Sequence, residues 1–347
     1  MTSTTIPSTM RASVLLEAGR IEMQERPVPT AGPGEVLVRV GSVGVCGSDV
    51  HYYKHGRIGD MVVTAPLVLG HEVSGTIVAV GPGVEEDRVG ERVALDPQVP
   101  CRRCRQCKAG RSNLCPFMEF YATPPFDGTF CDYVTAPADQ AFAVPDSMSD
   151  ESAALLEPLS VGLWAAHKGN VGPGDQVLIA GAGPIGAMVA QAVRACGATD
   201  IVVTDFVDSR RERITSFGAT RALHPVQDKD EIAALRVDTF VDCSGATPAV
   251  LSGIASTRGG GAVVLVGLGA EEMPIPVQLI ATREITLTGV FRYIDTWPRG
   301  IELETSGAVH LDDMVTARYP LEQVEEALNA DSDPLSMKAV VVVNPAA

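Results

Sequence analysis

One stretch constrains the fold more than any other: residues 176–205, QVLIAGAGPIGAMVAQAVRACGATDIVVTD. An apolar, β-rich run leads into a glycine turn, a helix-forming segment that stops at Gly197, and a second apolar run. Similar apolar runs follow in TFVDCSG, GAVVLVGLG and ITLTGVF, with helix-forming stretches between the earlier ones. Buried strands that alternate with helices predict an α/β fold, a doubly wound parallel sheet with helices on both faces.

The glycine turn has the pattern of a dinucleotide site. Gly181, Gly183 and Gly186 follow a strand and open a helix, which is the context that a Gly-x-Gly-x-x-Gly motif requires. These glycines permit a tight turn, let a pyrophosphate approach the backbone, and let the helix pack closely on the strand. Asp205 ends the next strand, where a carboxylate accepts hydrogen bonds from ribose hydroxyls and repels a 2′-phosphate, so we expect NAD rather than NADP. Arg210 either contacts the adenine or a phosphate, or is an ordinary exposed arginine.

The residues before and after this stretch have a different sequence pattern. Residues 1–160 carry short apolar runs punctuated by Gly and Pro, which predict an irregular β domain. Residues 161–295 form the predicted parallel-sheet domain, and we expect residues 296–347, with helices and a last strand, to return to the first domain.

Composition excludes several classes of protein. The formal net charge of −16 makes nucleic acid and anionic membranes unlikely partners. The sequence has no apolar run of the ~20 residues that span a bilayer, and its start lacks the pattern of a signal peptide. We therefore expect a cytoplasmic protein, in which eight cysteines indicate metal binding or catalysis rather than disulfides.

Four of these cysteines are close in sequence: Cys101, Cys104, Cys107 and Cys115. Four thiolates can surround one zinc ion completely, so this set predicts a closed, structural site. Interleaved basic residues would offset its negative charge: Arg102, Arg103, Arg105 and Lys108. The alternatives are two disulfides, a chance cluster, or a nucleic-acid zinc ribbon, and the last is disfavoured by the short loop and the acidic chain.

Cys46 stands apart, in CGSDVHYY. A catalytic zinc needs three protein ligands and one open position, and the candidate partners are His71 with either Glu72 or Glu157. Taken singly, each has an ordinary explanation as a core cysteine, a hydrogen-bonded histidine or a helix end. Spacing alone does not join them.

The motifs together resemble a known family. They are spread from about Met10 to Val343: VCGSDVHYY, GRIGD, LVLGHEVSGTIVAVG, LLEPLSVGLWAA, GAGPIG and GVFRYIDTWP. These motifs resemble those of the zinc-dependent medium-chain dehydrogenases, most closely the sorbitol and xylitol (polyol) branch. The resemblance implies a GroES-like irregular β catalytic domain, completed by the C-terminal segment, and a Rossmann coenzyme domain. It also implies an active site in the cleft between them, and a homotetramer.

The resemblance assigns the zinc ligands. Cys46 and His71 would hold the catalytic zinc; Glu72 is a ligand in some descriptions of polyol dehydrogenases, and Glu157 either binds zinc or holds its water. Animal sorbitol dehydrogenases lack the full structural cysteine set. This chain keeps all four cysteines, so it looks more like the microbial and plant-type members, and we expect two zinc ions per chain.

The resemblance also implies the other roles. Zinc would act as a Lewis acid on the substrate hydroxyl. Ser48 would take the proton of that hydroxyl, and His51 would pass the proton towards solvent. Asp49 either orients His71 or caps a helix. The expected substrate contacts are Tyr52, Glu157, Arg292 and Tyr293. The expected coenzyme contacts are Gly181, Gly183, Pro184, Ile185, Gly186, Asp205, Arg210, Val266, Gly267, Leu268, Val290, Phe291 and Arg292.

The predicted reaction moves a hydride from C2 of a sugar alcohol, such as sorbitol or xylitol, to NAD and gives the ketose. This is a sorbitol (L-iditol) 2-dehydrogenase type of activity on a small-molecule polyol. The alternatives are a zinc-dependent alcohol or threonine dehydrogenase and, less favoured, a non-catalytic NAD-binding homologue. Glu157 and GVFRY argue more strongly against a simple alcohol dehydrogenase than against a threonine dehydrogenase.

Overall fold

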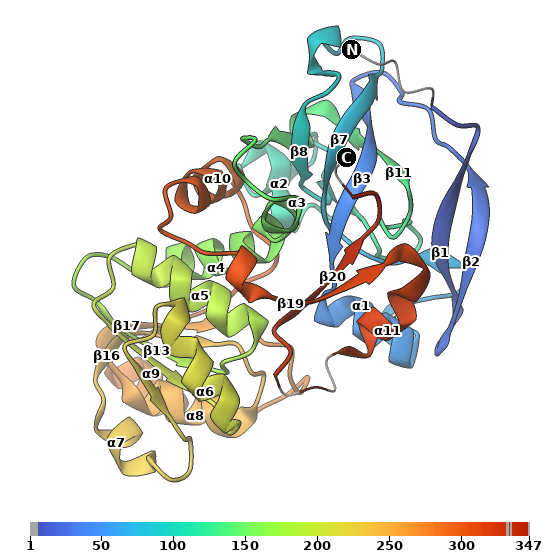
Figure 1. Cartoon of the computed structure of the whole chain (residues 1–347). Coiled ribbons are helices and arrows are strands. Elements are labelled where there is room, and N and C mark those ends of the chain that lie inside the picture. The colour runs from blue at the N-terminus through green and yellow to red at the C-terminus, as the bar shows by residue number, and fades with distance from the viewer. Residues whose placement is uncertain (1–5, 331–332, 334, 346–347) are drawn as a thin grey trace. The chain divides into compact units, whose positions relative to one another are not determined.

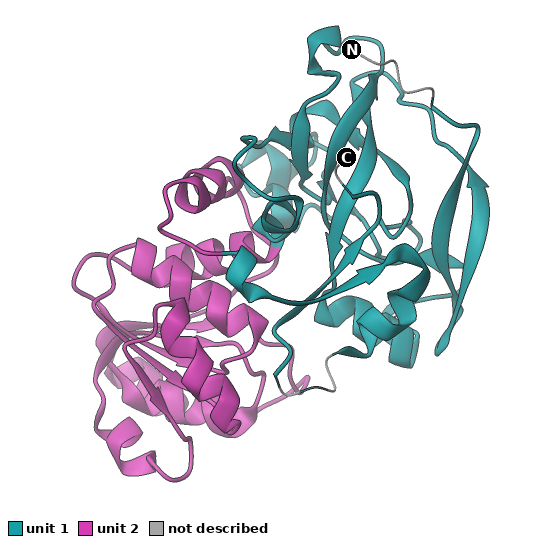
Figure 2. Cartoon of the chain, viewed as in Figure 1, with its two compact units in different colours: residues 1–157, 311–347 teal, residues 158–310 magenta. Residues whose placement is uncertain are grey.

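The computed structural model describes residues 6–330, 333 and 335–345. The chain divides into two compact units, residues 1–157 with 311–347 and residues 158–310, which Figure 2 distinguishes by colour. Across the described residues, no helix combines the length and the apolar composition that crossing a bilayer requires.

The first unit is built on a seven-stranded sheet with the order β12-β8-β7-β3-β20-β19, in which β11 pairs with the first half of β3. β3 is central because its end pairs with β7 on one side and with the C-terminal β20 on the other. The strands of this unit are β1 (Thr9–Glu17), β2 (Arg20–Pro27), β3 (Glu35–Gly44), β4 (Arg57–Ile58), β5 (Met61–Val62), β6 (Leu67–Val68), β7 (Glu72–Val80), β8 (Arg92–Leu95), β9 (Gln98–Val99), β10 (Glu119–Phe120), β11 (Tyr133–Pro137), β12 (Ala141–Ala143), β19 (Val315–Pro320) and β20 (Lys338–Val342). Its helices are α1 (Gly47–His55), α2 (Arg105–Lys108), α3 (Asp150–Ala154) and α11 (Val324–Leu328), and α4 (Leu156–Lys168) begins at its boundary.

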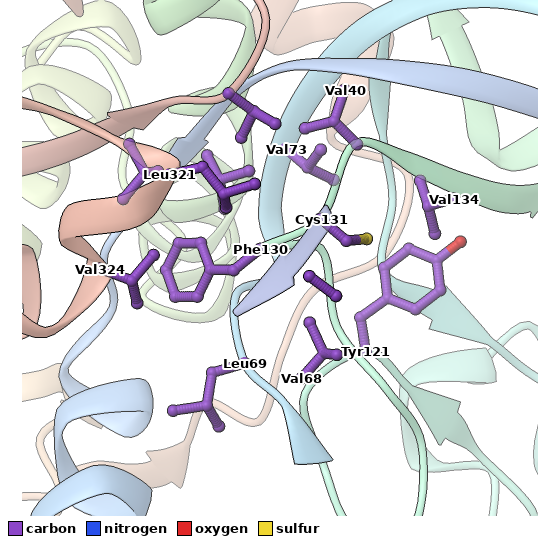
Figure 3. Close-up of a cluster of buried hydrophobic side chains, with 14 of the residues drawn as sticks. Val40, Val68, Leu69, Val73, Tyr121, Phe130, Cys131, Val134, Leu321 and Val324 are labelled. Atoms are coloured by element: carbon purple, nitrogen blue, oxygen red, sulfur yellow. The ribbon is translucent and has the colours of Figure 1, made fainter. Parts of the chain in front are cut away.

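The core of this unit joins its two chain segments. Figure 3 shows the fully buried Phe130 ring beside Val324 of α11, and Leu321 belongs to the same cluster. The ring also lies against the backbone that leads into β7, because a Cβ at Gly70 would meet it at 3.1 Å. Gly70 has φ +89°, a conformation that glycine adopts without strain. The core therefore fixes the turn directly before His71.

The second unit confirms the predicted doubly wound sheet. Six strands run in the order β15-β14-β13-β16-β17-β18, every pair is parallel, and helices flank the sheet on both sides (Figure 1). The strands are β13 (Gln176–Ala180), β14 (Asp200–Thr204), β15 (Arg221–Leu223), β16 (Val237–Asp242), β17 (Thr257–Leu265) and β18 (Thr286–Gly289). The helices are α5 (Pro184–Ala195), α6 (Asp208–Ile214), α7 (Lys229–Ala234), α8 (Thr247–Ser256), α9 (Val277–Thr282) and α10 (Trp297–Thr305).

The second unit extends further along the chain than the 161–295 of the sequence analysis. The unit includes α10 and ends at His310, whose backbone N–H donates to the side-chain carbonyl of Gln191 in α5 at 2.8 Å. Gly307 and Ala308 line a cavity of about 460 Å³ together with α5 residues. The segment 296–310 is therefore tied to the parallel-sheet unit. The outermost residues of the predicted first domain, 1–5 and 346–347, lie outside the described residues.

Candidate functional site

Three side chains with metal-ligand chemistry converge in the first unit. One ligand atom from each of Cys46, His71 and Glu72 lies within 4.8 Å of the others. Cys46 precedes the first residue of α1, while His71 and Glu72 stand at the start of β7. The structure thus brings together three positions that spacing alone did not connect.

Asp49 holds this cluster in shape. Its carboxylate is fully buried and accepts the backbone N–H of Cys46 at 3.1 Å and that of Gly70 at 2.9 Å. The same carboxylate lies 3.5 Å from Nδ1 of His71. Asp49 therefore stabilises the start of α1 and also faces His71, which leaves Nε2 of the ring as the nitrogen for a metal.

His71 is set up to hold a positive charge. Burial lowers the pKa of His71, but the negative charges of Asp49 and Cys46 raise it by more, so the pKa lies well above its ordinary value. A site that attracts a proton this strongly also favours a metal cation, which takes the place of the proton when it binds.

Glu72 crosses the neighbouring strand to reach a lysine. Its carboxylate is 1% exposed and accepts a hydrogen bond through Oε1 from Nζ of Lys338, at 2.6 Å. Glu72, Gly44 and Val340 lie side by side on β7, β3 and β20, so Gly44 stands between the glutamate and the strand that carries Lys338. A Cβ at Gly44 would lie 2.0 Å from Oε2 of Glu72. The missing side chain of Gly44 is therefore what lets the carboxylate cross β3.

Lys338 compensates the negative charge of the cluster. Its ammonium is buried and also donates to the carbonyl of Val45 at 2.8 Å. Burial lowers the pKa of Lys338, but Glu72, Cys46 and Glu157 together raise it above the ordinary value, so the side chain stays charged. A thiolate and two carboxylates exceed the charge of a zinc ion by one, and Lys338 supplies the balancing charge. Lys338 was missed in the sequence analysis because nothing in MKAVVVVNP indicates its partner.

The cluster fits a zinc ion. Oε2 of Glu72 is buried and accepts no hydrogen bond within the part of the chain that the structure describes, although it lies 2.6 Å from the Lys338 ammonium. A thiolate, an imidazole and a carboxylate oxygen are typical zinc ligands. Glu157 is also buried but is not one of the three clustered groups; it approaches closely enough for its charge to act on Lys338.

The proposed proton path lies on one face of α1. Ser48 is half-buried two residues after Cys46, and His51 lies one turn further and is exposed. Residues three apart on a helix share a face, so the hydroxyl and the imidazole point the same way. Tyr52, four residues after Ser48, is buried, and its hydroxyl donates to the sulfur of Met61 at 3.7 Å.

The four clustered cysteines form a second candidate metal site. One sulfur from each of Cys101, Cys104, Cys107 and Cys115 lies within 4.8 Å of the others, and all four thiols are free. The Cys104 sulfur lies 3.5 Å from that of Cys107 and 3.9 Å from that of Cys115. Sulfurs around a tetrahedral zinc are about 3.8 Å apart. The spacing therefore suits zinc and is too long for a disulfide.

The thiols of this set do not ionise alike. A hydrogen bond from the backbone of Arg103 lowers the pKa of Cys101 to about 6, while desolvation and neighbouring thiols raise the pKa of Cys107 to about 12. Bringing all four to the thiolate form requires a cation. Arg102 contributes its charge near Cys107 but also pairs with Asp139 at 2.5 Å, a partner that the sequence did not indicate.

In the second unit, the predicted coenzyme residues gather at the carboxyl edge of the parallel sheet. They lie in the loops, and in the first turns of α5 and α6, that follow the ends of β13, β14, β17 and β18. In an open parallel sheet, ligands bind at this edge, beside the point where the strand order reverses. That point lies between β13 and β16.

The glycine turn has the geometry that a dinucleotide requires. Gly181 has φ +99°, and a Cβ at Gly186 would lie 1.9 Å from the carbonyl oxygen of Gly181. A Cβ at Gly183 would meet no protein atom within 4 Å, so the space there is open for a pyrophosphate. Pro184 is the first residue of α5, whose N–H groups face the same space, and Ile185 follows it.

Asp205 and Arg210 lie after β14. The carboxylate of Asp205 accepts the backbone N–H groups of Ala182, in the glycine turn, at 2.8 Å and of Val207 at 2.9 Å. Its remaining lone pairs can accept ribose hydroxyls. Nε of Arg210 is buried and makes no hydrogen bond among the described residues.

Asp242 is a second residue that the sequence analysis missed. It ends β16, is buried, and accepts hydrogen bonds from Ser244 at 2.7 Å and from the backbone N–H of Gly245 at 3.0 Å. Its carbonyl accepts the N–H groups of Val266 and Gly267, both at 2.9 Å. Asp242 therefore ties together two of the loops at the coenzyme edge. A buried strand that ends in Asp before small residues, as in VDCSG, was the available signal.

The loop after β18 carries Val290, Phe291, Arg292 and Tyr293. The Arg292 guanidinium stacks over the Phe291 ring at 4.7 Å, and Arg292 has φ +56°. Tyr293 is buried against Trp297, with ring centroids 6.1 Å apart. Leu268, near the start of the loop after β17, is 80% exposed.

Comparisons with known proteins match this architecture. Residues 32–146 match the family model "Alcohol dehydrogenase GroES-like domain", and residues 184–306 match "Zinc-binding dehydrogenase". The sorbitol dehydrogenase of Bacillus subtilis (strain 168) is 43% identical over 332 residues, which are 93% of this chain and 94% of the relative. The chain belongs to the zinc-dependent medium-chain dehydrogenases, in the sorbitol dehydrogenase branch.

Solved structures of the family agree in fold. An Escherichia coli CFT073 alcohol dehydrogenase complexed with NADH has a TM-score of 0.91 at 28% identity, over 97% of this chain and 100% of its own. A zinc-binding dehydrogenase of Sinorhizobium meliloti 1021 bound to NADP has a TM-score of 0.90 at 30% identity, over the same shares. Zinc and a nicotinamide coenzyme are therefore the cofactors to which the two sites of this chain correspond.

We predict that Lys338→Met destabilises the zinc-free protein more than the zinc-loaded protein. Without the ammonium, Glu72 becomes a buried unpaired charge, which costs about 3–5 kcal/mol. A zinc ion that binds Oε2 offsets part of that cost. Urea unfolding with and without a chelator measures both values, and Lys229→Met, which removes an exposed lysine, is the control. Equal losses in the two states would contradict zinc binding by Glu72.

Proposed function

We propose that the protein is an NAD-dependent polyol dehydrogenase that oxidises C2 of a sugar alcohol, such as sorbitol or xylitol, to the ketose. The observation that carries this proposal is the cluster of Cys46, His71 and Glu72 in a chain of the sorbitol dehydrogenase branch. A carboxylate among the candidate zinc ligands makes the site more polar, which suits a substrate with several hydroxyls.

Zinc, when bound, supplies a Lewis acid that makes a substrate hydroxyl easier to deprotonate, and NAD supplies the hydride acceptor. The protein's own side chains transfer the proton of the substrate hydroxyl to solvent. Ser48 accepts it, because a hydroxyl both accepts and donates, and His51 on the next turn carries it to solvent. Asp49 keeps the His71 ring oriented throughout.

We assign the direct carboxylate ligand to Glu72. One of its oxygens lies within 4.8 Å of the ligand atoms of Cys46 and His71, a cluster that does not include Glu157, and the Lys338 ammonium lies 2.6 Å from both Glu72 oxygens. Glu157 then has the other role that the sequence allows, which is to hold a water or a substrate hydroxyl beside the metal. Lys338 is a positioning residue in this arrangement, because it acts through Glu72.

Three further features belong to the proposal. The second zinc is structural and bound by the four-cysteine set, whose sulfur spacing suits it. The protein is cytoplasmic, because all eight cysteines are free. It forms a homotetramer, as the family resemblance implies.

Two zinc ions per chain are the expected result of metal analysis on the purified protein. Cys101→Ser should remove one ion by opening the closed site, and Cys46→Ser should remove the other. Cys196→Ser, which changes a cysteine outside both sets, should keep both ions and is the control. A single zinc ion that persists in Cys101→Ser would rule out the structural site.

NAD should be strongly preferred over NADP, because the negative charge of Asp205 would repel the 2′-phosphate of NADP. Such a contact between like charges costs on the order of several kcal/mol. The ratio of kcat/KM for the two coenzymes measures this preference. Asp205→Asn should reduce the ratio, whereas Asp208→Asn removes the same charge from an exposed position nearby and should not. Equal efficiency of the two coenzymes with the unmodified enzyme would exclude a ribose contact by Asp205.

Oxidation of a polyol panel with NAD tests the reaction itself, and the product of sorbitol or xylitol should be a ketose. Arg292→Ala should impair pentitols and hexitols more than a short diol, because only long substrates present hydroxyls to the guanidinium. A hydrogen bond from a charged group contributes ~1.5–3 kcal/mol, or roughly tenfold to over a hundredfold in kcat/KM.

Arg299→Ala, at an exposed position on α10, is the matched control for this comparison. An aldose product, or equal losses for long and short substrates, would refute the assignment. Primary alcohols that outperform every polyol would move the protein to the alcohol dehydrogenase branch.

A further inference from the structure

Two exposed histidines lie together on α1. His51 and His55 are four residues apart, so their side chains leave the helix on the same face. Their ring centroids are 5.0 Å apart, with the ring planes inclined at 56°. Among the described residues, no hydrogen bond or ion pair engages either imidazole, so the ring nitrogens are available.

The helix that carries the pair is held rigidly from both ends. At its start, the buried Asp49 accepts the N–H of Gly70 at 2.9 Å. At its end, Gly56 has φ +66° and caps the helix through an N–H bond to the carbonyl of Tyr52. The Tyr53 hydroxyl donates to Glu325 at 2.5 Å. The backbone beneath both histidines is therefore fixed, and only side-chain rotation is needed to bring the rings together.

This geometry suits a metal ion. Two imidazole nitrogens bound at about 2.0–2.1 Å to a tetrahedral ion lie roughly 3.3 Å apart. Rings with centroids 5.0 Å apart reach that separation by turning nitrogens towards each other. His55 is the last residue of the helix, where the backbone carbonyls favour a cation. The net charge of −16 also attracts cations to the surface.

We propose that His51 and His55 form a surface site for a divalent transition-metal ion that prefers imidazole, such as Zn²⁺ or Ni²⁺, with water completing the coordination. This site is distinct from the cysteine-containing clusters, and its ion exchanges with solvent because two protein ligands hold it weakly.

Occupancy of the pair has a catalytic consequence, which rests on the proposed role of His51 as proton carrier. A metal ion on the ring takes the lone pair that His51 uses to receive a proton from Ser48. Excess zinc therefore inhibits the enzyme reversibly and leaves the zinc at Cys46 in place. Ser48, His51 and His55 share one face of the helix, so the site lies at the solvent end of the proton path.

Metal binding is tested first, on the enzyme loaded with its own zinc. Equilibrium dialysis with added Zn²⁺, and difference spectra with Ni²⁺, should reveal one further ion per chain. His55→Gln should remove most of this binding, because one of the two protein ligands is lost. His310→Gln, which removes an exposed histidine from the other unit, should leave it unchanged. Binding that is absent, or unaffected by His55→Gln, would overturn the site.

Inhibition is tested separately. Added Zn²⁺ should reduce kcat of the unmodified enzyme, a small excess of chelator should restore it, and His55→Gln should keep normal basal activity while resisting zinc. An additional ion that binds at the pair without inhibition would overturn the inhibitory consequence and also the relay role of His51. The binding measurement does not depend on turnover, so it decides the site even if the enzyme oxidises no polyol.

Discussion

The ion pair between Glu72 and Lys338 is the interaction on which the metal centre depends. Both groups are buried, at 1% and 3% exposure. The carboxylate is tolerable there only beside the ammonium or a metal ion, and the ammonium only beside negative charge. The pair forms because three strands lie in register and the middle one contributes Gly44 at the crossing point. The chemistry of the site is therefore determined by the order of strands in the sheet as much as by the ligands themselves.

Buried carboxylates do a similar task in both units. Asp49 holds the turns that present Cys46 and His71, and Asp242 holds the loops after β16 and β17. In each case, oxygens of the aspartate accept backbone N–H groups from segments without regular secondary structure. The residues before α1 and β7 and the loop after β16 are thus fixed by charge-assisted hydrogen bonds, which are stronger than those between neutral groups. The loop after β17 bonds instead to the backbone carbonyl of Asp242.

The features that could be predicted from the sequence are those that local sequence patterns determine. Alternating buried strands and helices gave the parallel sheet, and close spacing indicated the four-cysteine set. The family resemblance joined Cys46 to His71 across the chain. Lys338 and Asp242 were missed because their partners are set by tertiary structure. The pairing of Lys338 needs the register of β7, β3 and β20, and the role of Asp242 needs two loops that meet only in the folded sheet. The segment 296–310 likewise joins the second unit through contacts with α5 that no local pattern reveals.

The position of Lys338 has a consequence for how the metal centre forms. Glu72 lies on β7 and Lys338 on β20, so the two charges meet only where β20 has paired with β3. The C-terminal part of the chain that carries β20 also contributes Leu321 and Val324 to the hydrophobic core of the first unit. The charge balance of the metal centre and the packing of the core therefore depend on the same part of the chain.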